Sequence, residues 1–191
     1  PAFCKAGSGL ISAKLFPVEN SGRHLAVYNP ATRKYTPIDT CFSTHHLNFA
    51  HDEDNTLWTS GGGDVVGWLN TRKFLQTGDA QSSQGWTALI LDTSGDGKRG
   101  PYTEPGRPQI PGKDMRVRAG FYGVAISPVD GAGWGSFIGY PGGVVRLSPG
   151  NNPPQTALAE IFYVPMDDPR VPVHGFSPRG MDIDRNGVVW M

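Results

Sequence analysis

The chain has no excess charge of either sign, since its 17 lysines and arginines equal its 17 aspartates and glutamates. A nucleic-acid-binding domain ordinarily carries a basic face, so this balance argues against that class of protein. No apolar run approaches the ~20 residues that a membrane-spanning helix requires. We therefore expect that the protein has neither a nucleic-acid partner nor a membrane span.

Cysteine is scarce, with only Cys4 and Cys41 in 191 residues. A disulfide between them would close a loop of roughly 37 residues and contribute about 3–4 kcal/mol, mostly by restricting the unfolded chain. Two free, buried thiols are the alternative that the sequence leaves open. A disulfide requires an oxidising compartment, so the first interpretation predicts a periplasmic or secreted protein.

Common catalytic signatures are also missing. The chain contains no Gly-x-Ser-x-Gly, His-Glu-x-x-His or Cys-x-x-Cys sequence. The glycine runs at 61–63 and 142–143 lack the Lys-Ser/Thr pair of a phosphate-binding loop. These glycines are better explained as connections between strands.

Glycine and proline are abundant instead, with 26 and 17 copies, which is nearly twice their usual combined share of roughly 12%. Both residues disfavour long helices, because glycine costs a helix interior ~1 kcal/mol and proline ~3 kcal/mol. The five tryptophans and a 38% hydrophobic content exclude a disordered chain. The composition predicts a turn-rich, all-β protein.

Three segments repeat one pattern, a turn followed by two residues and a tryptophan: 54–58 (DNTLW), 130–134 (DGAGW) and 186–190 (NGVVW). A short apolar stretch precedes each turn. Asp-Asn, Asp-Gly and Asn-Gly reach positive φ at little cost and suit tight connections between antiparallel strands. Each unit is therefore predicted to be a strand, a tight turn, and a strand carrying the tryptophan.

Further apolar runs supply the other strands of such units. Third strands are predicted at 65–69 and 144–147, fourth strands at 87–91 and 157–163, and an outer hairpin at 25–39. Four-stranded antiparallel units repeated with a turn and an aromatic in each indicate a β-propeller. A β-sandwich with irregular loops is the alternative, but it does not account for the repeated tryptophan.

The predicted units divide the chain into four parts of one partial propeller domain, 1–191. Residues 1–44 are the tail of one blade, 45–120 a second blade with a long insertion, 121–177 a third, and 178–191 the start of a fourth. The chain would thus make about three to four blades. Because it ends directly after an apolar strand, we expect it to be a piece of a longer polypeptide, or one whose ring is completed by other chains.

The segment 178–190 (PRGMDIDRNGVVW) resembles the repeat of the streptogramin (virginiamycin B) lyase-like propellers, which are related to NHL-type repeats. More divergent copies at 46–58 and 122–134 fit the same template. The whole chain also resembles exported bacterial propeller proteins labelled carboxypeptidase-regulatory-like. The resemblance implies a propeller of commonly seven blades, more than these residues supply, and it carries information about blade architecture rather than chemistry.

Ligands of propellers usually bind at one mouth of the central channel, which the innermost strands line. Aligning the units places His46, Tyr122 and Arg179 just before those strands. Together they could bind an anion, or poise a histidine as a general base. Ordinary loop residues remain the alternative explanation.

A calcium loop is predicted at 92–98 (DTSGDGK), directly after an apolar strand. Asp92, Ser94 and Asp96 stand at positions one, three and five, a glycine at six allows the sharp turn, and the carbonyl of Lys98 lies at seven. Position twelve is Thr103 rather than the usual bidentate glutamate. A polar turn whose aspartates bond its own amides is the alternative.

Two functions compete. The first is an exported binding or scaffold propeller that engages a ligand or a protein at the channel mouth or through its loop insertions. The second is a lyase resembling the streptogramin lyases, in which a histidine base and a divalent cation open a cyclic ester by elimination. Only His46 and His174 are plausible bases here, and neither matches the family's catalytic motif residue by residue.

Overall fold

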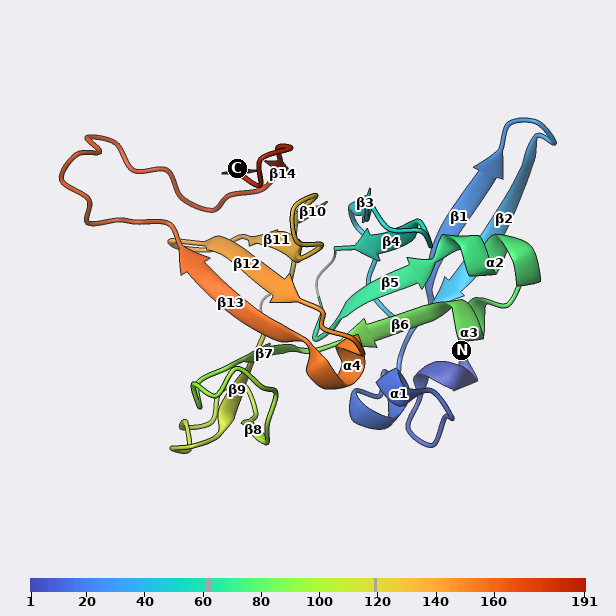
Figure 1. The fold of residues 1–191 in the computed structure, drawn as a ribbon, viewed down its shortest axis with the longest axis horizontal. Helices are drawn as coiled ribbons and strands as arrows, with labels where there is room; N and C mark the ends of the chain where they lie inside the picture. Colours follow the sequence, from blue (N-terminus) through green and yellow to red (C-terminus); the bar gives the residue numbers. More distant parts are fainter. Residues whose placement is uncertain (61–62, 119) are drawn as a thin grey trace.

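The computed structural model describes residues 1–60, 63–118 and 120–191. Strands hold 34% of the chain and helices 12%, which confirms a mostly β fold. Within the described residues, no helix has the length and apolarity needed to cross a bilayer. The strands form two larger sheets flanked by two separate hairpins (Figure 1).

The first sheet is a four-stranded antiparallel meander in chain order. Its strands are β3 (Leu47–Phe49), β4 (Thr56–Thr59), β5 (Val66–Asn70) and β6 (Gln84–Thr87). Two short helices, α2 (Thr71–Thr77) and α3 (Ala80–Ser83), connect β5 to β6. The Asn70 side chain caps the start of α2 by accepting from the Lys73 amide, and Gly78 ends it in the left-handed region.

The second sheet begins with the same meander. Its strands are β10 (Val124–Ile126), β11 (Gly133–Phe137), β12 (Gly143–Ser148) and β13 (Leu158–Tyr163), with α4 (Pro153–Thr156) before the last. Three strands then extend it beyond β13 in the order β7 (Leu89–Leu91), β9 (Asp114–Val117) and β8 (Tyr102–Thr103).

The long insertion was predicted to belong to the second blade, residues 45–120. Its strands β7, β8 and β9 instead belong to the second sheet. The strand predicted at 87–91 divides at Ala88, where β6 of the first sheet ends and β7 of the second sheet begins. Ala88 is fully buried in a cluster with Trp86 and Ile90. Sequence patterns could not show this division, because a continuous apolar run has the same composition in one sheet or in two.

Each of the remaining hairpins is a separate two-stranded sheet. The predicted outer hairpin is present as β1 (Arg23–Asn29) and β2 (Lys34–Thr40). The last unit consists of β14 (Asp182–Ile183) and β15 (Val189–Trp190). Short helices η1 (Ala2–Cys4) and α1 (Ile11–Leu15) form the N-terminal segment.

The strand register places the three repeat tryptophans at the same position of three sheets. Each lies on the second strand, where Trp58 pairs with Asn48, Trp134 with Ala125 and Trp190 with Asp182. The hairpin turns at Asn55, Gly131 and Gly187 all have positive φ, as the Asp-Asn, Asp-Gly and Asn-Gly sequences predict. The described sheets are open rather than closed into a ring, so they confirm the repeat but do not by themselves establish a propeller.

The first strands of successive units are neighbours, with β10 packed against β3 on one side and β14 on the other. Trp58 is only 5% exposed and packs in one apolar cluster with Val124 and Ile126 of β10. A second cluster surrounds the disulfide between Cys4 and Cys41, whose Cα atoms are 5.3 Å apart. The predicted disulfide is thus present, and it ties the N-terminal segment to the residue that directly follows β2.

A charged group at the second hairpin predicts a pH effect on stability. Asp130 accepts from the Arg146 guanidinium at 2.7 Å. Hydrogen bonds from Arg146 and Ser127 lower the pKa of Asp130 to about 2. Since the unfolded pKa is about 3.9, the stabilisation is complete above pH ~4 and disappears as the pH falls through 2.

We expect Asp130→Asn to lower the free energy of unfolding by about 0.5 kcal/mol at pH 7, because solvent screens this exposed pair. The difference from the parent should vanish near pH 2 in urea titrations. Glu53→Gln, an exposed carboxylate in the corresponding turn of the first unit, is the control and should change little at either pH. If Asp130→Asn lost the same unfolding free energy at pH 2 as at pH 7, the ionised Asp130 carboxylate would not be the cause of the loss.

Candidate functional site

Buried serines connect each unit to the next at the start of its first strand. The Ser60 hydroxyl accepts from the His46 amide at 2.9 Å and donates to the Tyr122 carbonyl at 2.6 Å. The Ser136 hydroxyl likewise accepts from the Gly123 amide at 2.9 Å and donates to the Arg179 carbonyl. The same hydrogen bonds thus set the spacing of three consecutive units.

The register corrects one alignment made from the sequence. The His45 amide donates to the Ser60 carbonyl at 2.7 Å, as the Tyr122 amide donates to the Ser136 carbonyl at 2.6 Å. His45, rather than His46, is therefore the counterpart of Tyr122 and Arg179. The sequence alignment was wrong by one residue because the first hairpin turn is longer than the other two, which shifts any count made from the tryptophan.

Nevertheless, the predicted ligand residues converge on one another. The His46 and Tyr122 rings are 5.2 Å apart between centroids, and His45 lies 4.8 Å from Tyr122. The Arg179 guanidinium lies over the Tyr122 ring at 5.4 Å, a cation–π contact. We call His45, His46, Tyr122 and Arg179 the four-residue site; it gathers side chains from three units.

Hydrogen bonding determines where the proton of neutral His46 resides. Its Nδ1 lies 2.7 Å from the Tyr122 carbonyl oxygen, which can only accept. Nδ1 must therefore carry a proton, and the His45 Nδ1 at 2.8 Å then faces it as an acceptor. The neutral His46 ring consequently keeps the lone pair of Nε2 free to accept a proton or bind a ligand.

Arg179 gives the four-residue site a positive charge. Arg179 has no salt-bridge partner in 1–60, 63–118 and 120–191. The only described histidine paired with a carboxylate is His24, with Asp39 at 2.9 Å, outside the site. Tyr122 is half-buried, whereas both histidines and Arg179 are exposed, so a ligand could reach all of these polar groups.

The other predicted base, His174, lies between β13 and β14 and is half-buried. Its Nδ1 is buried without a hydrogen-bond partner. No described aromatic contact or hydrogen bond joins it to the four-residue site. A catalytic role for either His46 or His174 stays a prediction.

The predicted calcium loop forms a turn stabilised by its own backbone. Asp92 Oδ1 accepts from the Gly95 amide at 2.7 Å and its Oδ2 from the Gly97 amide at 2.8 Å. The Gly97 and Gly95 amides hold the pKa of Asp92 below its ordinary value. The Ser94 hydroxyl donates to Asp92, and Asp96 accepts from the Lys98 amide.

These contacts fit the alternative of a self-bonded polar turn. Among the residues that the structure describes, no three His, Cys, Asp or Glu side chains are grouped to hold a metal ion. Asp114, the nearby aspartate of β9, is fully buried and accepts from the Gly100 amide at 2.7 Å. Calcium binding at Asp92, Ser94, Asp96 and Lys98 stays a prediction of the sequence.

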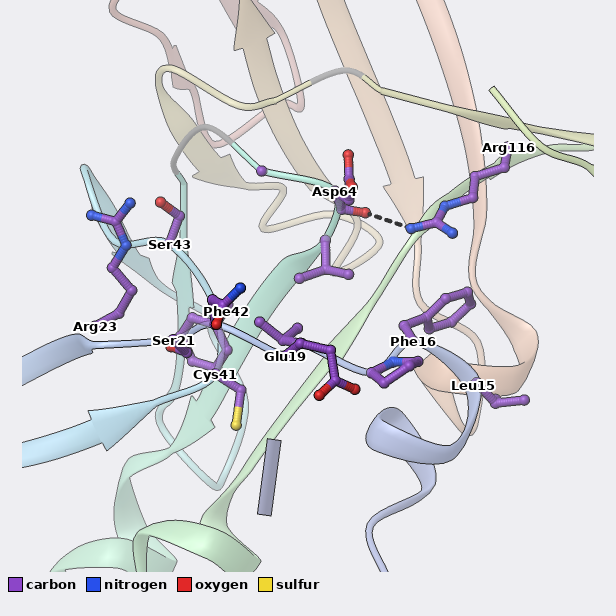
Figure 2. A pocket seen from close by; sticks show the side chains of 15 residues that line it. Leu15, Phe16, Glu19, Ser21, Arg23, Cys41, Phe42, Ser43, Asp64 and Arg116 are labelled. Atoms are coloured by element: carbon purple, nitrogen blue, oxygen red, sulfur yellow. Dashed lines mark hydrogen bonds between the residues drawn. The ribbon is translucent and has the colours of Figure 1, made fainter. Parts of the chain in front are cut away.

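A cavity of about 480 Å³, which sequence reasoning missed, lies beside the disulfide. Figure 2 shows Asp64 and Arg116 at one side and Glu19 below them. The Arg116 guanidinium donates to the Asp64 carbonyl at 3.5 Å and pairs with Glu104 at 3.3 Å. Because the lining residues come from four distant segments, no local motif could have identified this cavity.

The linking serines were also missed, although a signal for them exists. Both follow the repeat tryptophan in a Trp-x-Ser sequence, at 58–60 and 134–136.

No known family model, curated protein or solved structure matches this chain. The resemblance to lyase-like propellers therefore stays a prediction, and the geometry of the site is the basis for a function.

Proposed function

We propose that the chain is part of an exported, propeller-type binding domain that takes an anionic ligand at the four-residue site. The observation that supports this proposal is that two histidines, a tyrosine and an arginine come together from three repeat units. The arginine has no salt-bridge partner among the described residues. An anion is the ligand that these donors suit, since arginine presents a planar fork of N–H groups to carboxylate or phosphate oxygens.

The propeller arrangement is supported by three features of the repeat. The tryptophans share one register position, the first strands β3, β10 and β14 follow one another as neighbours, and the Trp-x-Ser serines repeat the same inter-unit bonds. Identical contacts between successive units generate a regular curved array. In such an array the four-residue site would lie at one mouth of the central channel.

Export is supported by the disulfide between Cys4 and Cys41, because such bridges persist in oxidising compartments. The lyase alternative gains no support from the described residues, since none of the contacts of the four-residue site involves a carboxylate. A binding role needs only the donors that are present.

Titration with inorganic phosphate and with acetate at constant ionic strength tests the proposal. We expect saturable binding of at least one anion by calorimetry, and a loss of about tenfold or more in Arg179→Gln, because a charge-assisted hydrogen bond contributes about 1.5–3 kcal/mol. Arg185→Gln, an exposed arginine of the same unit, is the matched control and should bind as the parent does. Absence of saturable binding, or equal losses in both variants, would refute the site.

A further inference from the structure

Another cavity, of about 460 Å³, is lined by residues of the first and second units. It lies at the end of their first strands opposite to the four-residue site. His46 directly precedes β3, whereas Ala50, which lines the cavity, directly follows it. Likewise, Tyr122 lies before β10 and Ser127, another lining residue, lies directly after it. The cavity is therefore separate from the proposed anion site.

Two tryptophans of the first sheet line this cavity. Trp58 and Trp68 are paired directly across β4 and β5, so their rings share one face of the sheet, with centroids 5.1 Å apart. Trp68 in turn pairs with Gly85 of β6, where an added Cβ would collide with its ring. Trp58 is only 5% exposed, whereas Trp68 is half-buried. Trp68 therefore supplies the accessible aromatic surface, held in place by Trp58 and the backbone of β6.

Two carboxylates from the β3–β4 turn also line the cavity. Asp52 and Asp54 are both exposed, and neither has an ion-pair partner in 1–60, 63–118 and 120–191. Asp52 Oδ1 accepts from the Thr56 amide at 2.9 Å, and the Asp54 carbonyl accepts from the Arg72 amide at 3.1 Å. These hydrogen bonds hold the turn in place, so both carboxylates are presented to the cavity without a compensating charge.

The remaining lining residues add apolar surface but no fixed positive charge. No described lysine or arginine is among them. Arg99 donates to the Pro153 carbonyl at 3.4 Å, but its own side chain does not line the cavity. The wall contributed by the second unit contains three prolines, at 128, 149 and 153. The cavity therefore combines negative charge with aromatic and aliphatic surface, which suits a cation that carries apolar substituents.

We propose that this cavity binds a quaternary ammonium group, with the cation against the Trp68 ring and near the carboxylates of Asp52 and Asp54. The face of an aromatic ring attracts such a cation through its quadrupole, and tryptophan does so most strongly. A quaternary ammonium has no N–H to donate, so it needs negative potential and apolar contact rather than acceptors in a fixed geometry. The volume also falls in the range of small-molecule sites, roughly 300–1,000 Å³.

Choline is the probe, titrated at constant ionic strength and at about pH 8, so that a charged histidine at position 51, which also lines the cavity, does not contribute. We expect saturable binding by calorimetry, with a change in tryptophan fluorescence. The neutral isostere of choline, in which carbon replaces the nitrogen, should bind at least about tenfold more weakly, because it lacks the attraction to the ring and to the carboxylates.

Three variants locate the site. Asp54→Asn should weaken choline binding about fivefold, because it removes one nearby charge. Glu53→Gln is the matched control, since this exposed carboxylate of the same turn does not line the cavity, and it should bind as the parent does. Trp68→Leu should weaken binding about tenfold or more. Should Trp68→Leu fail to fold, as a urea titration would show, the comparison of Asp54→Asn with Glu53→Gln decides the test.

Each other result overturns the inference. Equal binding of choline and its neutral isostere would show an apolar cavity without selectivity for a cation, and equal losses in Asp54→Asn and Glu53→Gln would place the cation elsewhere. Binding of methyl glucoside without binding of choline would indicate a saccharide site instead. The inference does not rest on the proposed anion site: Arg179→Gln should bind choline as the parent does, and phosphate should not displace it.

Discussion

The double variant Cys4→Ala/Cys41→Ala is expected to lose about 3–4 kcal/mol of unfolding free energy, because a loop of 37 residues is released in the unfolded chain. The bridge anchors the N-terminal segment beside an apolar cluster that includes Trp86. The Trp86 indole also donates to the Phe16 carbonyl at 2.7 Å. Alanine is preferred over serine because it buries no new hydroxyl in the cluster around Trp86.

Urea unfolding followed by tryptophan fluorescence measures this loss. The parent should show the same destabilisation when a reductant is added, whereas the double variant should not respond to it. Equal urea midpoints for the oxidised parent and the double variant would contradict a stabilising bridge. A thiol assay on the unfolded, non-reduced parent provides the check that both cysteines are paired.

Trp58→Ala is expected to lower the unfolding free energy by about 3–5 kcal/mol, the usual cost of truncating a buried tryptophan. The indole fills the space between the first two units, against Val124, Ile126 and the Trp68 ring at 5.1 Å. Its removal leaves a cavity between two sheets whose spacing the Ser60 hydrogen bonds maintain, so the cavity cannot collapse easily.

Trp190→Ala is the matched control, since it removes the same side chain from the same register position on an exposed strand. Both changes are made in the otherwise unchanged chain. The control should then cost less than ~0.5 kcal/mol. Similar losses of unfolding free energy in the two variants would mean that the buried tryptophan does not stabilise the packing of one sheet against the next.

Local sequence signals predicted the hairpins well. The turns around Asn55, Gly131 and Gly187 require positive φ, which few residues adopt at low cost, so their composition reveals them. The hairpin at 25–39 and the third strands were also predicted correctly. Short or alternating apolar runs bounded by turn residues usually form strands.

The candidate site was predicted only in part. His46, Tyr122 and Arg179 were expected together and are together, but the contribution of His45 was missed. Its position depends on the length of one hairpin turn and on the bonds that the Ser60 hydroxyl makes across two units. Such contacts span 62 residues of sequence and leave no periodic trace in either segment.

The sequence by itself determined the β class, the repeated strand–turn–strand unit and the pair of cysteines, because these depend on local backbone preferences and on composition. Tertiary structure alone decided that β7 leaves the first sheet for the second, that Asp92 bonds its own turn, and which apolar faces stay uncovered. The reason is physical: backbone preferences act over a few residues, whereas the pairing of a sheet edge and the burial of a face depend on which distant segment arrives there.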